Sequence, residues 1–354
     1  MDRVIKVLVV DDSAYIRKVI KQMLLRSPYI EVLGTAGDGQ TALEMVAQLN
    51  PDVVTVDLIM PQLDGLEFIR RQMAIKPLPI LVVSIASEAG DLLLAALDAG
   101  AVDFVQKPTA LSTDKIFQIN DELIEKVKTA GNIAPHFLSK VLPKSSLDNP
   151  EILLEKIPIK TYQKLSSDIV LIGISTGGPQ ALTYLIPQIP ADFPVPIAIV
   201  LHMPIGYTKL YAQRLNDLSK LEVREAKAGE ILTAGVVFIA PAGRHLSFMR
   251  QSDGKIVTHL DSRPFDTLHR PSVDVMFKSA AEVYGDRVLG VVMTGMGSDG
   301  KEGSAWIKSQ GGKIFTEAES TCVVYGMPRS VDEAKLSDQS FPLHEMAKAI
   351  INAI

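Results

Sequence analysis

The sequence lacks several features that particular classes of protein require. Among its 354 residues there is one cysteine, Cys322, so a disulfide framework is excluded and a reducing, cytoplasmic location is expected. Basic residues do not predominate, since the formal net charge is -5, and this argues against a nucleic-acid partner. No apolar run approaches the roughly 18 residues of a membrane helix, and the N-terminal "MDRVIKVLVVDDS" lacks the apolar core of a signal peptide. We therefore expect no membrane insertion.

What is present is an alternation of apolar runs and helical patterns. Hydrophobic residues make up 47% of the chain, enough for two buried cores. In the first 130 residues, strand-like runs alternate with helical segments such as "RKVIKQML" and "GLEFIRRQM". The strand-like runs are "KVLVV", "EVLGTA", "DVVTVD", "ILVVS" and "VDFVQK". This alternation predicts a five-stranded parallel sheet covered by helices on both faces.

The pattern breaks between residues 129 and 167. Glycine, four prolines and scattered lysines occur there without strand or helix periodicity, as in a linker. We therefore predict domains at 1–128 and 168–354 joined by this linker. A single domain with a long irregular loop is the alternative.

Alternation resumes from "SDIVLIGIS" onward and predicts a second, doubly wound α/β domain. The expected strands are 169–174, 196–201, 236–240 and 288–293. The expected helices are 178–187, 207–218, 272–284 and 299–309. A β-rich insert containing "FIAPAGRHLSF" and "KIVTHL" is expected between them.

Polar side chains follow four of the strands in the first half. Asp11 and Asp12 follow "VLVV", Asp57 follows "VVTV", Ser84 ends the fourth strand and Lys107 the fifth. In an open parallel sheet these ends converge on one crevice. Three carboxylates there would repel one another unless a hard cation such as Mg²⁺ neutralised them. Each acid taken alone also fits a helix N-cap, but the set of five favours a site that stabilises a phosphorylated carboxylate.

The motifs "VVDDS", "VDLIMPQLDG", "VVSIAS" and "FVQKP" resemble the receiver domain of two-component response regulators, a flavodoxin-like fold. The resemblance covers residues 4 to about 128. It implies phosphorylation of Asp57 and a Mg²⁺ site formed by Asp11, Asp12, Asp57 and the carbonyl of Ile59.

The same resemblance assigns three further residues around the phosphoryl group. Ser84 and Lys107 would contact its oxygens, and Phe104 occupies the position of the switch aromatic. A histidine kinase is then the implied phosphodonor.

In the second half, "VLIGISTGGPQAL" places Ser175 in a glycine-rich turn after an apolar run. Glycines allow a sharp turn, and the pattern G-x-S-x-G matches that of a nucleophile elbow. The match alone supports two interpretations of Ser175 equally, as a nucleophile and as a residue of a structural turn.

A nucleophilic serine needs a base and an acid that orients the base. Of the six histidines, His202 directly follows "IAIVL", the next strand along the chain, and so ends at the same sheet edge as Ser175. Asp299 lies in a third glycine-rich strand–turn–helix segment, "MTGMGSDG", where it fits a helix cap as well as a partner of His202.

Together "GISTGG", "LHMP", "MTGMGSDG", "APAGRHL", "HRPSVDVMF" and "CVVYGMPRS" resemble the catalytic domain of the chemotaxis protein-glutamate methylesterases. The resemblance implies a triad of Ser175, His202 and Asp299. Leu201 departs from the glutamine that many members of that family have before the histidine.

Three residues around the triad take their roles from the same resemblance. It implies oxyanion donation by the backbone N–H groups of Thr176 and Met296. It also implies that His269 supports the triad or contacts the substrate, and it implies no cofactor in this domain.

The implied substrate is a glutamate methyl ester on the cytoplasmic helices of a chemoreceptor, with methanol as product. Deamidation of receptor glutamines at the same positions is also implied. Two alternatives remain: a methylesterase-like regulator that serves a non-chemotaxis receptor array, and a non-enzymatic response regulator.

Overall fold

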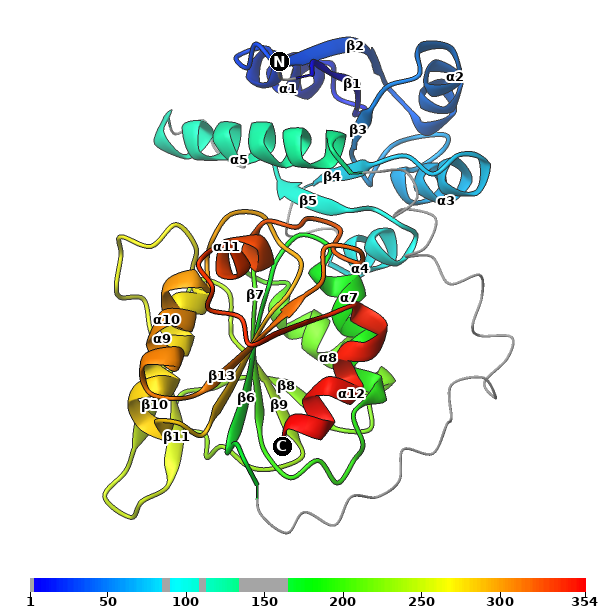
Figure 1. Ribbon diagram of the computed structural model, residues 1–354. Helices are drawn as coiled ribbons and strands as arrows, with labels where there is room; N and C mark the ends of the chain where they lie inside the picture. The colour runs from blue at the N-terminus through cyan, green and yellow to red at the C-terminus, as the bar shows by residue number, and fades with distance from the viewer. Residues whose placement is uncertain (1–2, 85–89, 108–112, 134–164) are drawn as a thin grey trace.

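The computed structural model describes residues 3–84, 90–107, 113–133 and 165–354 (Figure 1). Most of the predicted linker, residues 134–164, lies outside the described residues, and the predicted domain boundaries therefore stay predictions. Among the described residues no helix combines the length and the hydropathy needed to cross a membrane.

The first half forms the predicted five-stranded parallel sheet, in the order β2-β1-β3-β4-β5. Its strands are β1 (Ile5–Val10), β2 (Ile30–Ala36), β3 (Val53–Val56), β4 (Ile80–Ser84) and β5 (Asp103–Gln106). Its helices are α1 (Ala14–Leu24), α2 (Gly39–Leu49), α3 (Gly65–Ile75), α4 (Gly90–Asp98) and α5 (Thr113–Gly131). Helices α1 and α5 cover one face, and α2, α3 and α4 cover the other (Figure 1).

Helix starts in this domain follow local capping chemistry. The side chains of Ser13, Asp38 and Asp64 each accept a hydrogen bond from the backbone N–H three residues on. Such caps satisfy N–H groups that the first turn of a helix leaves open. Strand β3 is buried throughout, as expected of a central parallel strand.

The second half forms a seven-stranded sheet in the order β14-β13-β12-β6-β7-β9-β8, with every neighbouring pair parallel. Its strands are β6 (Ile169–Ile174), β7 (Ile197–Leu201), β8 (Glu222–Glu225), β9 (Val236–Ile239), β12 (Val288–Val292), β13 (Lys313–Glu317) and β14 (Gln339–Phe341). The helices are α7 (Gly178–Leu185), the 3-10 helix η2 (Ile186–Gln188), α8 (Thr208–Leu218), α9 (Val273–Tyr284), α10 (Lys301–Ser309), α11 (Met327–Glu333) and α12 (Leu343–Ala353). The predicted doubly wound fold is confirmed.

The predicted β-rich insert is present, and its two strings supply both of its strands. The first residues of "FIAPAGRHLSF" still belong to β9, which pairs with β7 and β8 in the main sheet. Strands β10 (His245–Arg250) and β11 (Ile256–Asp261) form a separate antiparallel pair. The main-sheet helices and strands that were predicted agree with the structure within about two residues.

The two halves meet at the C-terminal edge of the second sheet. Helix α4 of the first half lies beside α7 and α8 of the second (Figure 1). Gln180 of α7 donates from its side-chain amide to the carbonyls of Leu97, at 2.6 Å, and Ala101, at 2.9 Å. Arg214 of α8 forms an ion pair with Asp98 of α4. This contact covers the edge at which strand order reverses, between β6 and β12.

Candidate active site and phosphoacceptor site

The turn after β6 holds Ser175 at the edge of the second sheet. Its N–H donates to the carbonyl of Thr294 at 3.0 Å, and its own carbonyl accepts from the N–H of Gly178 at 2.7 Å. Gly177 has a φ of 79°, and a Cβ there would lie 2.7 Å from Val323. Glycine is therefore required at this position for both conformation and space.

His202 lies next to this turn because of the strand register. Strand β6 pairs Ile174 with Leu201 of β7, so Ser175 and His202 are the next residues of two neighbouring strands. The N–H of His202 donates to the carbonyl of Ile174 at 3.2 Å. On the imidazole, Nε2 lies 2.9 Å from Oδ2 of Asp299, whereas Nδ1 is buried and has no hydrogen-bond partner in the described part of the chain. If the Nε2 proton is donated to Asp299, the Nδ1 lone pair is free to accept a proton.

The carboxylate of Asp299 is anchored at the N-terminus of α9. It accepts from the hydroxyl of Ser272 at 2.9 Å and from the N–H groups of Val273, at 2.8 Å, and Asp274, at 2.9 Å. Burial alone would raise the pKa of Asp299, but His202 and these N–H groups hold that pKa below its usual range. The group therefore stays charged beside His202.

Asp274 caps helix α10 in return. Its Oδ1 accepts from the N–H of Gly300 at 2.9 Å and of Gly303 at 2.7 Å. Burial and the neighbouring charge of Asp299 raise the pKa of Asp274. The two acids thus fix the N-termini of α9 and α10 against each other, and Asp299 keeps the negative charge.

His269 stacks on the imidazole of His202, with ring centroids 4.0 Å apart and an interplanar angle of 21°. Burial, together with the charge of His202, lowers the pKa of His269 to about 4. His269 is therefore neutral near pH 7 and confines the plane of the His202 imidazole by contact.

Thr176 and Met296 lie on the two loops that flank Ser175. Neither backbone N–H group donates a hydrogen bond to a backbone carbonyl in the loops and turns of the described residues. The loop containing Met296 approaches the serine closely, since a Cβ on Gly295 would lie 2.8 Å from that of Ser175. Both N–H groups are thus available to an oxyanion formed at the serine.

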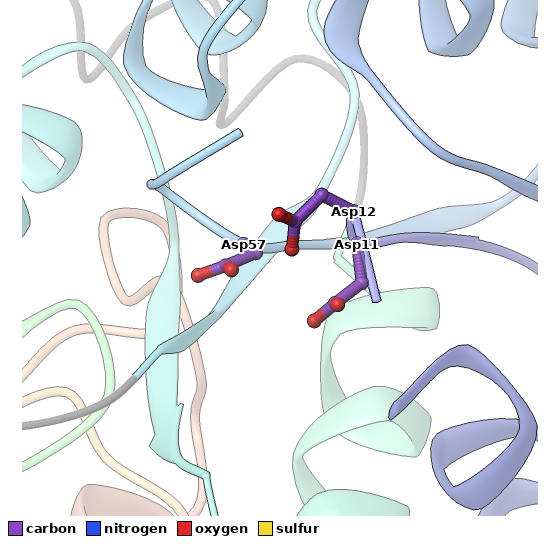
Figure 2. Close-up of side chains that lie close together, drawn as sticks. All are labelled: Asp11, Asp12 and Asp57. Carbon is purple, nitrogen blue, oxygen red and sulfur yellow. The ribbon is translucent and has the colours of Figure 1, made fainter. Parts of the chain in front are cut away.

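A second cluster of charged side chains lies at the C-terminal edge of the first sheet. Carboxylate oxygens of Asp11, Asp12 and Asp57 lie within 4.8 Å of one another (Figure 2). Nζ of Lys107 lies 2.6 Å from Oδ2 of Asp11 and 2.6 Å from Oδ2 of Asp57. Burial raises the pKa of Asp11. Three carboxylates facing one ammonium leave excess negative charge, which suits a hard divalent cation.

The remaining residues predicted for this crevice differ in their placement. Ser84 ends β4, is buried, and accepts the N–H of Lys107 through its carbonyl at 2.9 Å. Ile59, two residues after Asp57, is exposed. Phe104 lies in the contact between the halves, with its ring centroid 5.7 Å from that of Tyr207.

Comparison with known proteins gives the family of both halves. The CheB methylesterase family model matches residues 170–350, and the response regulator receiver domain model matches residues 7–118. The chain belongs to the CheB methylesterase family. It is similar to the protein-glutamate methylesterase/protein-glutamine glutaminase 5 of Myxococcus xanthus, with 46% identity over 97% of this chain and 96% of that protein.

A second methylesterase relative comes from Thermotoga maritima. It is a protein-glutamate methylesterase/protein-glutamine glutaminase that is 40% identical over 100% of this chain and 99% of its own. The crystal structure of the Thermotoga maritima CheB methylesterase catalytic domain matches with a TM-score of 0.52 and 42% identity, covering 54% of this chain and all of that domain. Both full-length relatives align with this chain over almost the whole length of each protein.

Sequence reasoning missed several residues of this methylesterase site. Ser272 and Asp274 flank the start of α9, where the string "PSVD" carries a recognisable capping signal. Thr294 contacts the serine turn through both its carbonyl and its hydroxyl, and no local pattern marks that role. Asp103, of the first half, forms a hydrogen bond with the hydroxyl of Thr176, which only the packing of the two halves brings about.

Proposed function

We propose that the chain is a phosphorylation-regulated serine esterase of the cytoplasm. It hydrolyses glutamate methyl esters on the cytoplasmic helices of chemoreceptors, releases methanol, and deamidates receptor glutamines to glutamate. The observation that carries this proposal is the hydrogen bonding of the His202 imidazole. One of its nitrogens lies 2.9 Å from Asp299, and its other nitrogen is buried and unpartnered among the described residues, beside the Ser175 turn.

In the first half of the reaction, Ser175 Oγ attacks the ester carbonyl carbon while its proton passes to Nδ1 of His202. The charge that develops on the carbonyl oxygen is stabilised by the N–H groups of Thr176 and Met296, at roughly 3–4 kcal/mol per donor. Asp299 stabilises the imidazolium that forms. Nδ1 then returns the proton to the departing methoxide, and methanol leaves.

In the second half, a water molecule attacks the glutamyl-serine ester and gives a proton to Nδ1. The bond from carbon to Oγ breaks, the serine recovers its proton, and glutamate is released. A receptor glutamine follows the same path with ammonia as the leaving group. Neutral His269 supports both steps because it holds the imidazole plane without competing for the proton.

The receiver half is proposed to accept phosphate on Asp57 from a chemotaxis histidine kinase. Asp11, Asp12, Asp57 and the Ile59 carbonyl would hold Mg²⁺, which neutralises charge during phosphoryl transfer when bound. Lys107 already lies against Asp57, and a phosphoryl group there would take over that ammonium together with the Ser84 hydroxyl.

We further propose that the unphosphorylated receiver inhibits the esterase through contacts with the oxyanion loops. The carboxylate of Asp103 accepts a hydrogen bond from the hydroxyl of Thr176, and the hydroxyl of Thr129 lies 3.0 Å from the sulfur of Met296. Phe104, next to Asp103, packs on Tyr207. A change at the Phe104 switch position would therefore act next to the contact on Thr176, one of the two residues proposed to stabilise the oxyanion.

The test uses methylated receptor and a methanol-release assay. Ser175→Ala should abolish release and leave phosphorylation of Asp57 intact, and release near the wild-type rate would assign the chemistry elsewhere. Fragment 160–354 should release methanol faster than the full chain without a phosphodonor. Equal rates would contradict inhibition by the receiver.

Two alternatives are separated by cheap measurements. A non-enzymatic response regulator would leave Ser175 unreactive, whereas an esterase should label there with a serine-directed electrophile. A methylesterase-like enzyme for a non-chemotaxis receptor array would label at Ser175 but fail to release methanol from methylated chemoreceptors.

A further inference from the structure

Glu317 is a fully buried acid behind the active site that the proposed chemistry does not use. It ends β13, the strand next to β12, and its exposed fraction is 0%. Its carboxylate accepts the N–H of Thr294 at 3.0 Å and the hydroxyl of Thr321 at 3.0 Å. In the described part of the chain no cation pairs with it, and burial raises its pKa to about 7. A buried carboxyl without a cation costs stability, so its presence calls for a role other than stabilising the fold.

The first partner of Glu317, Thr294, holds the nucleophile turn at two points. The Thr294 carbonyl accepts the N–H of Ser175 at 3.0 Å. Its hydroxyl donates to the carbonyl of Thr176 at 3.0 Å and accepts the N–H of Val324 at 3.0 Å. One residue therefore fixes both the nucleophile and the residue after it.

The second partner, Thr321, ties the same carboxylate to the loop that covers the turn. Its hydroxyl accepts the N–H of Leu343 at 2.9 Å, while it donates to Glu317. Further along this loop, the Val324 carbonyl accepts the N–H of Gly295 at 3.0 Å. Glu317 thus joins the two loops that enclose Ser175.

We propose that Glu317 is a positioning residue of the esterase: its carboxylate oxygen holds Thr294, and through Thr294 it holds Ser175 and Thr176 in the geometry needed for attack. Glu317 touches no reacting atom. The proposal rests on the proposed nucleophilic role of Ser175. It requires the reach of the side chain to the Thr294 N–H, and it does not require the negative charge.

Reach and charge are separated by two conservative substitutions in the full chain, assayed with phosphodonor and Mg²⁺. Glu317→Gln keeps an acceptor oxygen at the same reach without the charge. Glu317→Asp keeps the charge but withdraws it by about one bond length, ~1.5 Å. Glu319→Gln, at an exposed acid two residues further on, is the matched control.

We expect Glu317→Asp to lower kcat for methanol release about tenfold with KM changed less than about twofold, because the Thr294 N–H is left without its acceptor. Glu317→Gln should retain kcat within about twofold of wild type, as should Glu319→Gln. An unchanged kcat in Glu317→Asp, an equal loss in Asp and Gln, or a rise in KM alone would overturn the proposal.

A second readout removes the receptor from the test. The rate at which a serine-directed electrophile labels Ser175 should fall about tenfold in Glu317→Asp and stay near wild type in Glu317→Gln. If the Ser175→Ala variant is still labelled by the electrophile and still releases methanol, the proposed function itself fails. That outcome is distinct from a failure of the role proposed for Glu317. Should Glu317→Asp not fold, Thr294→Val tests the last link of the connection, since it removes the hydroxyl bond to the Thr176 carbonyl and keeps the backbone N–H that Glu317 accepts. An unchanged kcat in that variant would equally overturn the proposal.

Discussion

The two crevices of this chain lie at equivalent places in two parallel sheets and use their acids differently. Each lies past the carboxyl ends of the strands where strand order reverses, between β1 and β3 in the receiver and between β6 and β12 in the esterase. In the receiver, three carboxylates face one ammonium. In the esterase, the acid beside His202 also accepts two backbone N–H groups and a hydroxyl.

The difference shows how one topology serves two chemistries. An under-compensated acidic crevice attracts a cation and then a phosphoryl group, so the receiver site responds to charge. A carboxylate whose lone pairs are occupied by a helix N-terminus stays ionised and immobile, so it orients a base. The esterase site is thereby organised in advance, and the receiver lies against it through Asp103 and Thr176.

Asp299→Asn is expected to have the largest effect, because it removes the charge of the acid that orients His202 in the esterase half. The amide nitrogen cannot accept hydrogen bonds and would donate to Nε2 of His202, which selects the wrong imidazole tautomer. We expect kcat for methanol release to fall about 10³–10⁴-fold, the size seen when a triad acid is neutralised. Phosphorylation of Asp57 serves as the control and should be unchanged. A loss below about tenfold would mean that Asp299 only caps α9.

Glu317→Gln extends the comparison of the acids in the two halves to a buried acid that has no cationic partner among the described residues. Because the folded-state pKa of Glu317 is raised to about 7 from 4.5, the folded chain keeps a proton that the unfolded chain has already lost, and stability falls as the pH rises through this window. The glutamine variant lacks this loss. Its free energy of unfolding relative to wild type should therefore increase by about 2–3 kcal/mol between pH 5 and pH 8, measured by urea denaturation. A difference that is independent of pH would contradict the raised pKa.

Asp103→Ala tests the link between the two crevices and has the smallest expected effect. It removes the receiver's hydrogen bond to Thr176, so methanol release without a phosphodonor should rise up to about tenfold, as expected for the loss of one charge-assisted bond. Glu122→Gln is the matched control, since Glu122 shares the ion-pair partner Lys126 with Asp103 but lies on the exposed side of α5. An equal rise in both variants would assign the effect to Lys126.

Much of the fold was predictable because long apolar strands and capped helices are local signals. The central strands β1, β3, β6 and β12 are almost wholly buried and read as continuous apolar runs. Strand β14, in contrast, has two exposed residues and one that is half-buried, and β8 has only one buried residue of four. Their pairing at the sheet edges depends on neighbours that sequence periodicity does not reveal.

The candidate site was predictable to the extent that strand ends converge. Ser175 and His202 follow two strands that pair in register, so their proximity follows from the parallel sheet. The anchoring of Asp299 by α9, the stacking of His269 and the connection from Glu317 through Thr294 all join segments far apart in the chain. Hydrogen bonds of that kind leave no spacing rule in the sequence.

By itself, the sequence determined the two α/β domains, the acids at the receiver edge and the candidate serine, histidine and aspartate, because apolar periodicity and turn residues act over a few neighbouring positions. The tertiary structure alone decided which nitrogen of His202 faces Asp299, which side chains support the serine turn, and that Asp103 of the receiver lies on Thr176. Those contacts depend on directions and distances between elements, which are fixed only when the helices and the two domains pack together.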